Sequence, residues 1–119
     1  MSTPITVIGN VTHTPELSTT HSGTPVVNLT LAENHRRQVE GEWVDAGTTY
    51  WEIVAFGDQA ENIVGSLLRG ARAIAVGTSR TRTWTTSEGE DRSVLEIVAD
   101  EIGPSLRWAT TQVTRVSGS

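Results

Sequence analysis

The sequence contains no cysteine, no lysine and no long run of apolar residues. Without cysteine the chain forms neither disulfides nor thiolate metal sites. A membrane-spanning helix needs about 18 consecutive apolar residues, and no window of this 119-residue chain approaches that length. Residues 1–4 do not begin the basic-then-apolar segment of a secretory signal. We therefore expect a cytoplasmic protein with no membrane partner.

Positive charge is also scarce: the chain has nine arginines and 14 acidic residues, which give a formal net charge of -5. Such a balance argues against a general polyanion binder, which is usually basic. The arginines are clustered, however: five of the nine fall between residues 69 and 92, and Arg36-Arg37 form a second cluster. Positive faces on an acidic body are compatible with this distribution.

Alternation of apolar and polar residues predicts that the chain is mostly β. Strands are expected at 5–11, 24–34, 47–56, 71–84 and 93–102, with a loop or long hairpin tip at 33–45. Residues 58–68 instead follow the i, i+3, i+4, i+7 apolar spacing of a helix, with Asp58 as N-cap and Gly70 as stop.

Residues 106–116 are predicted to form one extra strand, so that the chain divides into a barrel domain, 1–104, and a C-terminal segment, 105–119, comprising this strand and a short polar end. Three strands, a helix and two strands is the order of the OB-fold, a five-stranded Greek-key barrel whose helix lies between strands three and four. Any small α+β barrel could give the same order, so the strand count does not by itself indicate a function.

The segment 71–84 has an alternation problem. Strict parity places Ile74 and Val76 on the same outer face as Arg80. Either Gly77 marks a bulge that resets the alternation, or another subunit covers the outer apolar residues. We expect a mixture of the two, with an oligomer the larger part.

The stretch SRTRTW places Arg80, Arg82 and Trp84 on one face of a strand. In the strand at 47–56, the same parity directs Trp51 inward and leaves Tyr50 and Phe56 on the solvated side. Exposed rings together with arginines suit single-stranded nucleic acid, where each stacked base contributes about 1–3 kcal/mol. Stacking does not depend on base identity, so we expect binding without strong sequence preference.

Other interpretations compete with this one. A single tryptophan at a strand end more often packs in a core or hairpin, and Tyr50 and Phe56 could cap the barrel. The role of Trp43 stays open between ligand contact and local packing, and Arg36 and Arg37 could simply be solvated.

The three histidines show no metal-ligand spacing and no phosphate-binding motif opens the helix, so we expect no enzyme, catalytic residue, metal or cofactor. The main alternative is an OB-fold accessory or scaffold protein that binds DNA weakly.

Several blocks resemble the bacterial single-stranded DNA-binding protein family, in order and spacing over some ninety residues: ITVIGN, SGTPVVNLTLA, VAFGDQAENIV, LLRGA, RTRTW and EIVADEI. The ending GPSLRWATTQV resembles the extra strand with which actinobacterial-type members clamp their subunits. The resemblance implies an OB-fold homotetramer that wraps and protects single-stranded DNA in replication, recombination and repair. It also implies stacking by Tyr50, Phe56 and Trp84, and backbone contacts by Arg80 and Arg82.

Two departures from the family pattern limit these expectations. Many members have another aromatic where this chain has Arg36-Arg37, so that stack is weakened or replaced by a guanidinium plane. The family usually carries a long tail with an acidic, apolar tip that recruits other proteins, whereas this sequence stops at Ser119. Partners recruited through such a tail are therefore not expected.

Overall fold

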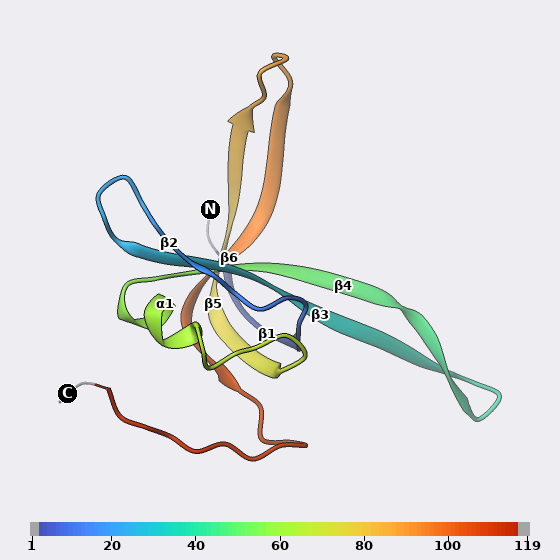
Figure 1. Cartoon of the computed structure of the whole chain (residues 1–119). Coiled ribbons are helices and arrows are strands. Elements are labelled where there is room, and N and C mark those ends of the chain that lie inside the picture. Colours follow the sequence, from blue (N-terminus) through green and yellow to red (C-terminus); the bar gives the residue numbers. More distant parts are fainter. Residues whose placement is uncertain (1–2, 117–119) are drawn as a thin grey trace.

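The computed structural model describes residues 3–116, and Figure 1 shows a small barrel from which two long hairpins project. Its elements follow the order β1 (Thr3–Val11), β2 (Leu17–Thr19), β3 (Pro25–Val39), β4 (Glu42–Phe56), α1 (Asp58–Ile63), β5 (Arg72–Thr85) and β6 (Asp91–Pro104). The sheet order is β1-β5-β6-β4-β3-β2, and a further pairing of β1 with β3 closes the barrel. The predicted mostly-β barrel, with its helix between the third and fourth barrel strands, is confirmed. The short edge strand β2 was not predicted.

Alternation along the barrel strands builds the core. The inward side chains of β3 and β4 are almost fully buried, among them Leu29, Leu31 and Ile53. Trp51 packs against this core, as predicted, and its Nε1 donates a hydrogen bond to Glu33 at 2.9 Å. Val54 was expected on the solvated side, yet it is only 4% exposed because its register neighbours Asn28 and Val98 flank it.

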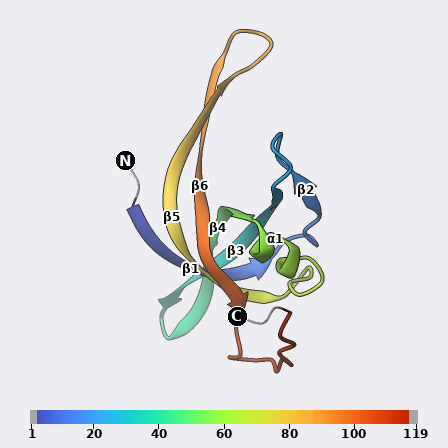
Figure 2. The ribbon, with the colours of Figure 1, turned by 90° about the vertical axis from the view of Figure 1, so that its left-hand side faces the viewer.

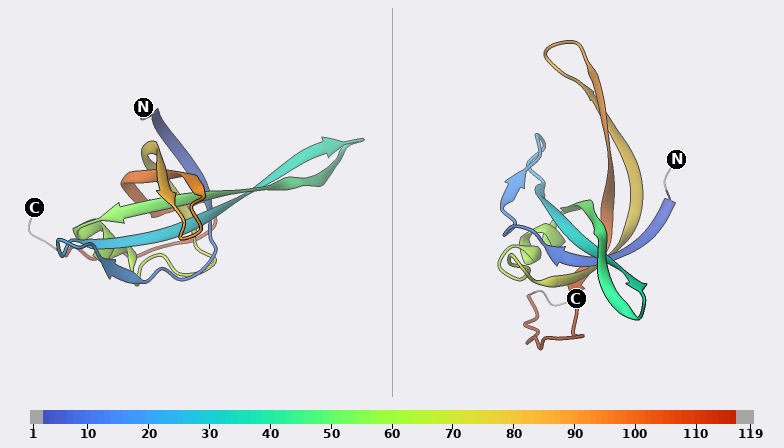
Figure 3. Two further views of the ribbon diagram at one scale, coloured as in Figure 1. Left: turned by 90° about the horizontal axis from the view of Figure 1, so that it is seen from above. Right: turned by 90° about the vertical axis from the view of Figure 1, so that its right-hand side faces the viewer.

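The β3–β4 hairpin is longer than predicted. The polar stretch expected as a loop pairs almost to its end, and only Glu40 and Gly41, both with positive φ, lie between the strands. Such a two-residue connection with two positive φ angles fits the right-handed twist of paired strands. Figure 3 shows this hairpin and the β5–β6 hairpin leaving the barrel in different directions.

The predicted helix is only partly correct. It begins at Asp58, but Gly57 with φ 71° is its N-cap, and no side chain caps it. It ends at Ile63 rather than before Gly70, because Val64 is extended and Gly65 takes a φ of 89°. Leu67 is nevertheless buried as the apolar spacing required, whereas Leu68 is exposed.

A bulge is present at Gly77 as predicted, but it does not reset the alternation of β5. Val76 pairs with Glu101 and Gly77 with Ala99, so the extra residue, Asp100, belongs to β6. A Cβ atom on Gly77 would lie 2.1 Å from the carbonyl oxygen of Val98, so only glycine fits this close approach. Because the extra residue is on β6, β5 keeps its alternation, and Ile74 and Val76 remain exposed.

The extra C-terminal strand is not formed. Residues 105–116 carry no strand in the described chain, because a strand requires a neighbour and none pairs with this segment. The segment is held near the barrel by a hydrogen bond from the Ser105 amide to the Arg72 carbonyl, and the Trp108 ring contacts the guanidinium groups of Arg72 and Arg107. Figure 2 shows it beyond the end of β6, opposite the β5–β6 hairpin. Residues 117–119 of the predicted polar end lie outside the described residues.

Across residues 3–116, no helix is long and apolar enough to cross a membrane.

Candidate nucleic-acid interface

Strand register brings the predicted ring and arginine residues of β4 and β5 to one surface. Residues directly opposite each other in paired strands leave the sheet on the same side. One row of partners therefore crosses four strands, from Arg80 through Glu96 and Glu52 to Thr30. The platform face is the surface made by this row and its alternating neighbours, and it comprises Val26, Asn28, Thr30, Ala32, Tyr50, Glu52, Val54, Phe56, Thr78, Arg80, Arg82, Trp84, Arg92, Val94, Glu96 and Val98.

Three aromatic rings stand on the platform face and remain open to solvent. Tyr50 is 63% exposed, Trp84 43% and Phe56 38%. Tyr50 and Phe56 are six residues apart on β4, or about 20 Å at a rise of roughly 3.3 Å per residue. None of the three is in the core of the described chain, so the interpretation that Trp84 packs there is wrong.

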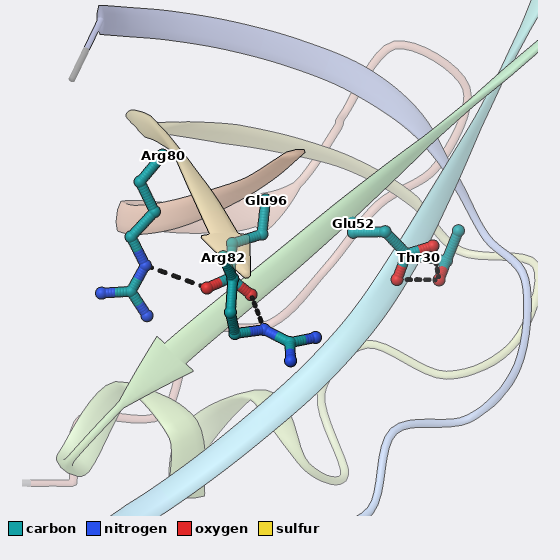
Figure 4. Close-up of polar contacts among 5 residues, drawn as sticks. All are labelled: Thr30, Glu52, Arg80, Arg82 and Glu96. Atoms are coloured by element: carbon teal, nitrogen blue, oxygen red, sulfur yellow. Dashed lines mark hydrogen bonds and ion pairs between the residues drawn. The ribbon is translucent and has the colours of Figure 1, made fainter. Parts of the chain in front are cut away.

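Both platform arginines are already engaged by one carboxylate. The Arg80 Nε donates to a Glu96 carboxylate oxygen at 2.9 Å, and the Arg82 Nε lies 3.5 Å from the other oxygen. Figure 4 shows Glu96 between the two guanidinium groups. About half of each arginine side chain is exposed, and the terminal nitrogens point away from Glu96 (Figure 4).

Arg82 also lies over Trp84, with 4.9 Å between its guanidinium carbon and the ring centroid. This is within the range of a cation–π contact. The ring borders two hollows. One is lined by Asn28, Glu52, Ile53, Arg82, Trp84, Val94 and Glu96 and has a volume of about 210 Å³; the other lies near the hairpin end, beside Asp91 and Arg92.

Glu52 places a second carboxylate on the platform face, beside Glu96 in register. The hydroxyl of Thr30 donates to its two oxygens at 3.1 and 3.2 Å. Two arginines and two glutamates therefore meet within this row and its neighbour, so the centre of the face carries little net charge. Affinity for a polyanion would depend here more on the rings than on charge.

The β3–β4 hairpin separates the predicted pair Arg36 and Arg37. Both are exposed, but adjacent residues of a strand leave opposite faces. At the bulge beyond Asn34, the single residue His35 on β3 lies opposite two residues on β4, Ala46 and Gly47. The extra residue is therefore on β4, so β3 keeps its alternation and Arg36 shares the side of Ala32 and Asn34. Trp43, 62% exposed, pairs with Gln38 and falls on the Arg36 side.

Sequence reasoning missed Glu96 and Glu52 as members of the interface. The available signal was the alternation Val94, Glu96, Val98, which puts one glutamate among apolar residues of the strand that follows the SRTRTW hairpin. Reading the hairpin pairing would have set Glu96 opposite Arg80. Among residues 3–116 no group of three or more histidine or acidic side chains is arranged to hold a metal ion.

Residues 3–105 match the single-strand binding protein family. The single-stranded DNA-binding protein of Mycobacterium leprae is 47% identical over 98% of this chain and 71% of its own length. That of Paenarthrobacter nicotinovorans is 46% identical over 98% of this chain and 70% of its own length.

Solved structures show the same barrel. The small single-stranded DNA-binding protein of Streptomyces coelicolor superposes with a TM-score of 0.74 and 30% identity, over 88% of this chain and 95% of its own. The Plasmodium falciparum protein in complex with single-stranded DNA also gives a TM-score of 0.74, at 23% identity, over 86% of this chain and 93% of its own, and shows likeness of fold alone. From the match over residues 3–105 and the identity to its actinobacterial relatives, the chain belongs to the single-strand binding protein family.

Proposed function

We propose that this chain binds and protects single-stranded DNA without strong sequence preference, in DNA replication, recombination and repair. The main evidence for this proposal is that Tyr50, Phe56 and Trp84 are exposed on one face, beside Arg80 and Arg82. Unpaired bases offer ring faces to stack on, and phosphates to contact the outward guanidinium nitrogens. Family membership supports the same function.

Contacts beyond the barrel are assigned to the β3–β4 hairpin. Arg36 and Trp43 fall on one side of it and extend the row of rings and cations. Arg37 leaves the opposite side, where it could contact only a strand that wraps around the hairpin.

The proposal is tested by titrating the protein with oligo(dT) and following tryptophan fluorescence. Stacking on Trp84 should quench the emission, and a duplex of the same length should compete poorly because its base faces are hidden. An unchanged spectrum at micromolar protein, with no retardation of labelled oligo(dT), would contradict the proposal.

We further propose a cytoplasmic homotetramer with no catalytic activity of its own. The support for assembly is an exposed apolar patch on the outside of β1 and β5, where Ile8 pairs with Ile74 and Val76 follows two residues later. Such patches on a sheet face commonly mark protein contacts. A second subunit would also give the segment after Pro104 a partner with which to form its missing strand.

One observation favours the alternative of a scaffold that binds DNA weakly. Glu52 and Glu96 offset the positive charge of Arg80 and Arg82 at the centre of the platform face, which weakens its attraction for phosphates. A scaffold would assemble normally but bind oligo(dT) no better than duplex DNA. Light scattering with and without oligonucleotide distinguishes this outcome from the main proposal.

A further inference from the structure

The structure assigns Glu96 as a positioning residue of the DNA-binding face: it fixes the guanidinium of Arg82, which in turn fixes the ring of Trp84. This inference rests on the proposed single-stranded DNA binding, which it deepens. Glu96 itself is only 5% exposed and lies beneath the arginines, so it holds them from below rather than meeting the nucleic acid.

Glu96 contacts the inner nitrogen of each arginine rather than its terminal nitrogens. Both contacts to Glu96 use Nε, the nitrogen nearest the strand, at 2.9 Å from Arg80 and 3.5 Å from Arg82. A carboxylate that merely neutralised the arginines would be as well served by their terminal nitrogens. The Arg80 contact is a hydrogen bond and the Arg82 contact is an ion pair. A contact through Nε restricts the side-chain torsions and leaves the two terminal nitrogens for a phosphate, in the fork geometry that arginine offers.

Arg82 in turn contacts the ring of Trp84. The guanidinium carbon lies 4.9 Å from the ring centroid, and Trp84 is two residues further along the same face of β5. Arg92, the register partner of Trp84, and Val94 also border the ring, which is still 43% exposed. Because Arg82 lies over the ring, a base would meet a stacking surface that is already oriented.

Glu52 provides a control that distinguishes the positioning effect of Glu96 from the effect of its charge. Glu52 is the register partner of Glu96, on the same face, but its carboxylate is held by the Thr30 hydroxyl and contacts neither arginine. Glu52→Gln and Glu96→Gln therefore remove the same charge from neighbouring positions. Only Glu96→Gln also weakens the hold on Arg80 and Arg82.

Affinity for oligo(dT) then has an expected order. Removing one carboxylate from the platform face should tighten binding about twofold at low salt, and Glu52→Gln should show this. Glu96→Gln should bind at least about threefold more weakly than Glu52→Gln, since freed side chains must be ordered again when DNA binds. Binding within threefold of Glu52→Gln, or tighter, would make Glu96 a simple counter-charge and overturn the inference.

A second readout needs no DNA. With 5-fluorotryptophan incorporated, the four tryptophans report separately in fluorine NMR, and Trp84→Phe assigns the Trp84 signal. Glu96→Gln should shift or broaden that signal, Glu52→Gln should leave it in place, and the signals of Trp51 and Trp108 should not move in either. An unmoved Trp84 signal in Glu96→Gln also overturns the inference.

Arg82→Lys covers the case in which Glu96→Gln fails to fold, as judged by circular dichroism and a thermal melt. It keeps the charge but loses the planar group over Trp84, so it should move the same fluorine signal. A signal in its wild-type position would contradict the inference. If the wild-type chain itself fails to bind oligo(dT), the proposed function is wrong, and the fluorine measurements still decide whether Glu96 and Arg82 orient Trp84.

Discussion

Glu52 and Glu96 are register partners in the parallel pairing of β4 with β6, which sets two carboxylates side by side at the centre of the platform face. Arg80 and Arg82 contact Glu96, so part of their charge is balanced before any nucleic acid arrives. A face of this kind attracts DNA weakly over long range. Its affinity must come mainly from stacking and from a few close phosphate contacts.

Salt dependence measures how many such contacts form. For single strands, each phosphate neutralised contributes about -0.7 to the slope of log K against log salt. One to two effective contacts per subunit predict a slope of about -0.7 to -1.4, shallower than for a lysine-rich relative. Oligo(dT) titrations over a series of chloride concentrations give the slope, and a value steeper than about -2 per subunit would contradict the charge balance described.

The two hairpin arginines should differ. Arg36→Ala removes a cation from the side of the hairpin that carries Trp43, and should cost about 1 kcal/mol of binding free energy for a long oligo(dT). Arg37→Ala removes the same charge from the opposite side, so its cost should be smaller by a factor of two or more in free energy. Fluorescence anisotropy of labelled oligonucleotide measures both. Equal losses would show that the DNA contacts both sides of the hairpin.

Gly77→Ala should destabilise the barrel strongly. The new Cβ atom would lie 2.1 Å from the Val98 carbonyl oxygen, which is backbone and cannot move aside without breaking the β5–β6 pairing. We expect a loss of about 3 kcal/mol or more in the free energy of unfolding, from urea titration.

Gly103→Ala is the control for this change, because its Cβ would meet nothing within 4 Å. It should shift the free energy of unfolding by less than about 0.5 kcal/mol. Protein concentration is varied in both titrations, so that an effect on assembly appears as a concentration dependence. Similar stabilities for the two variants would contradict the close approach at the bulge.

The proposed tetramer should dissociate when charge enters the apolar patch. Val76→Glu places an unpaired carboxylate beside Ile74, which is costly to bury in an interface. Val39→Glu is the matched control, since both valines are 43% exposed and Val39 lies at the hairpin tip. Light scattering should give a smaller mass for Val76→Glu alone. A tetramer that survives Val76→Glu would move the interface elsewhere.

Period-two alternation was enough to predict most of the barrel, because each strand has one buried side. It predicted the inward Trp51 and the outward Tyr50, Phe56, Arg80, Arg82 and Trp84 correctly. It failed where tertiary contacts override local pattern: Val54 is outward yet buried between Asn28 and Val98, and the helix stops early at Val64 although Leu67 keeps its buried place.

The remaining differences between prediction and structure depend on which strands pair, and the sequence of a single strand does not show its partner. Glu33–Asp45 is mostly polar and has no continuous apolar side, so its pattern did not distinguish a paired hairpin from a loop. Glu96 joins the site only once β6 is set against β5, since its partners are 14 and 16 residues away. The segment after Pro104 has strand-like composition but no pairing partner among residues 3–116.

The most direct measurement compares wild type, Trp84→Ala and Trp108→Ala in oligo(dT) titrations at fixed salt. Trp84→Ala should lose about 1–3 kcal/mol of binding free energy and most of the fluorescence quenching, because a stacking surface disappears. Trp108, which contacts Arg72 and Arg107 away from the platform face, should be replaceable with the affinity unchanged. Wild-type affinity and quenching in Trp84→Ala would contradict the stacking platform.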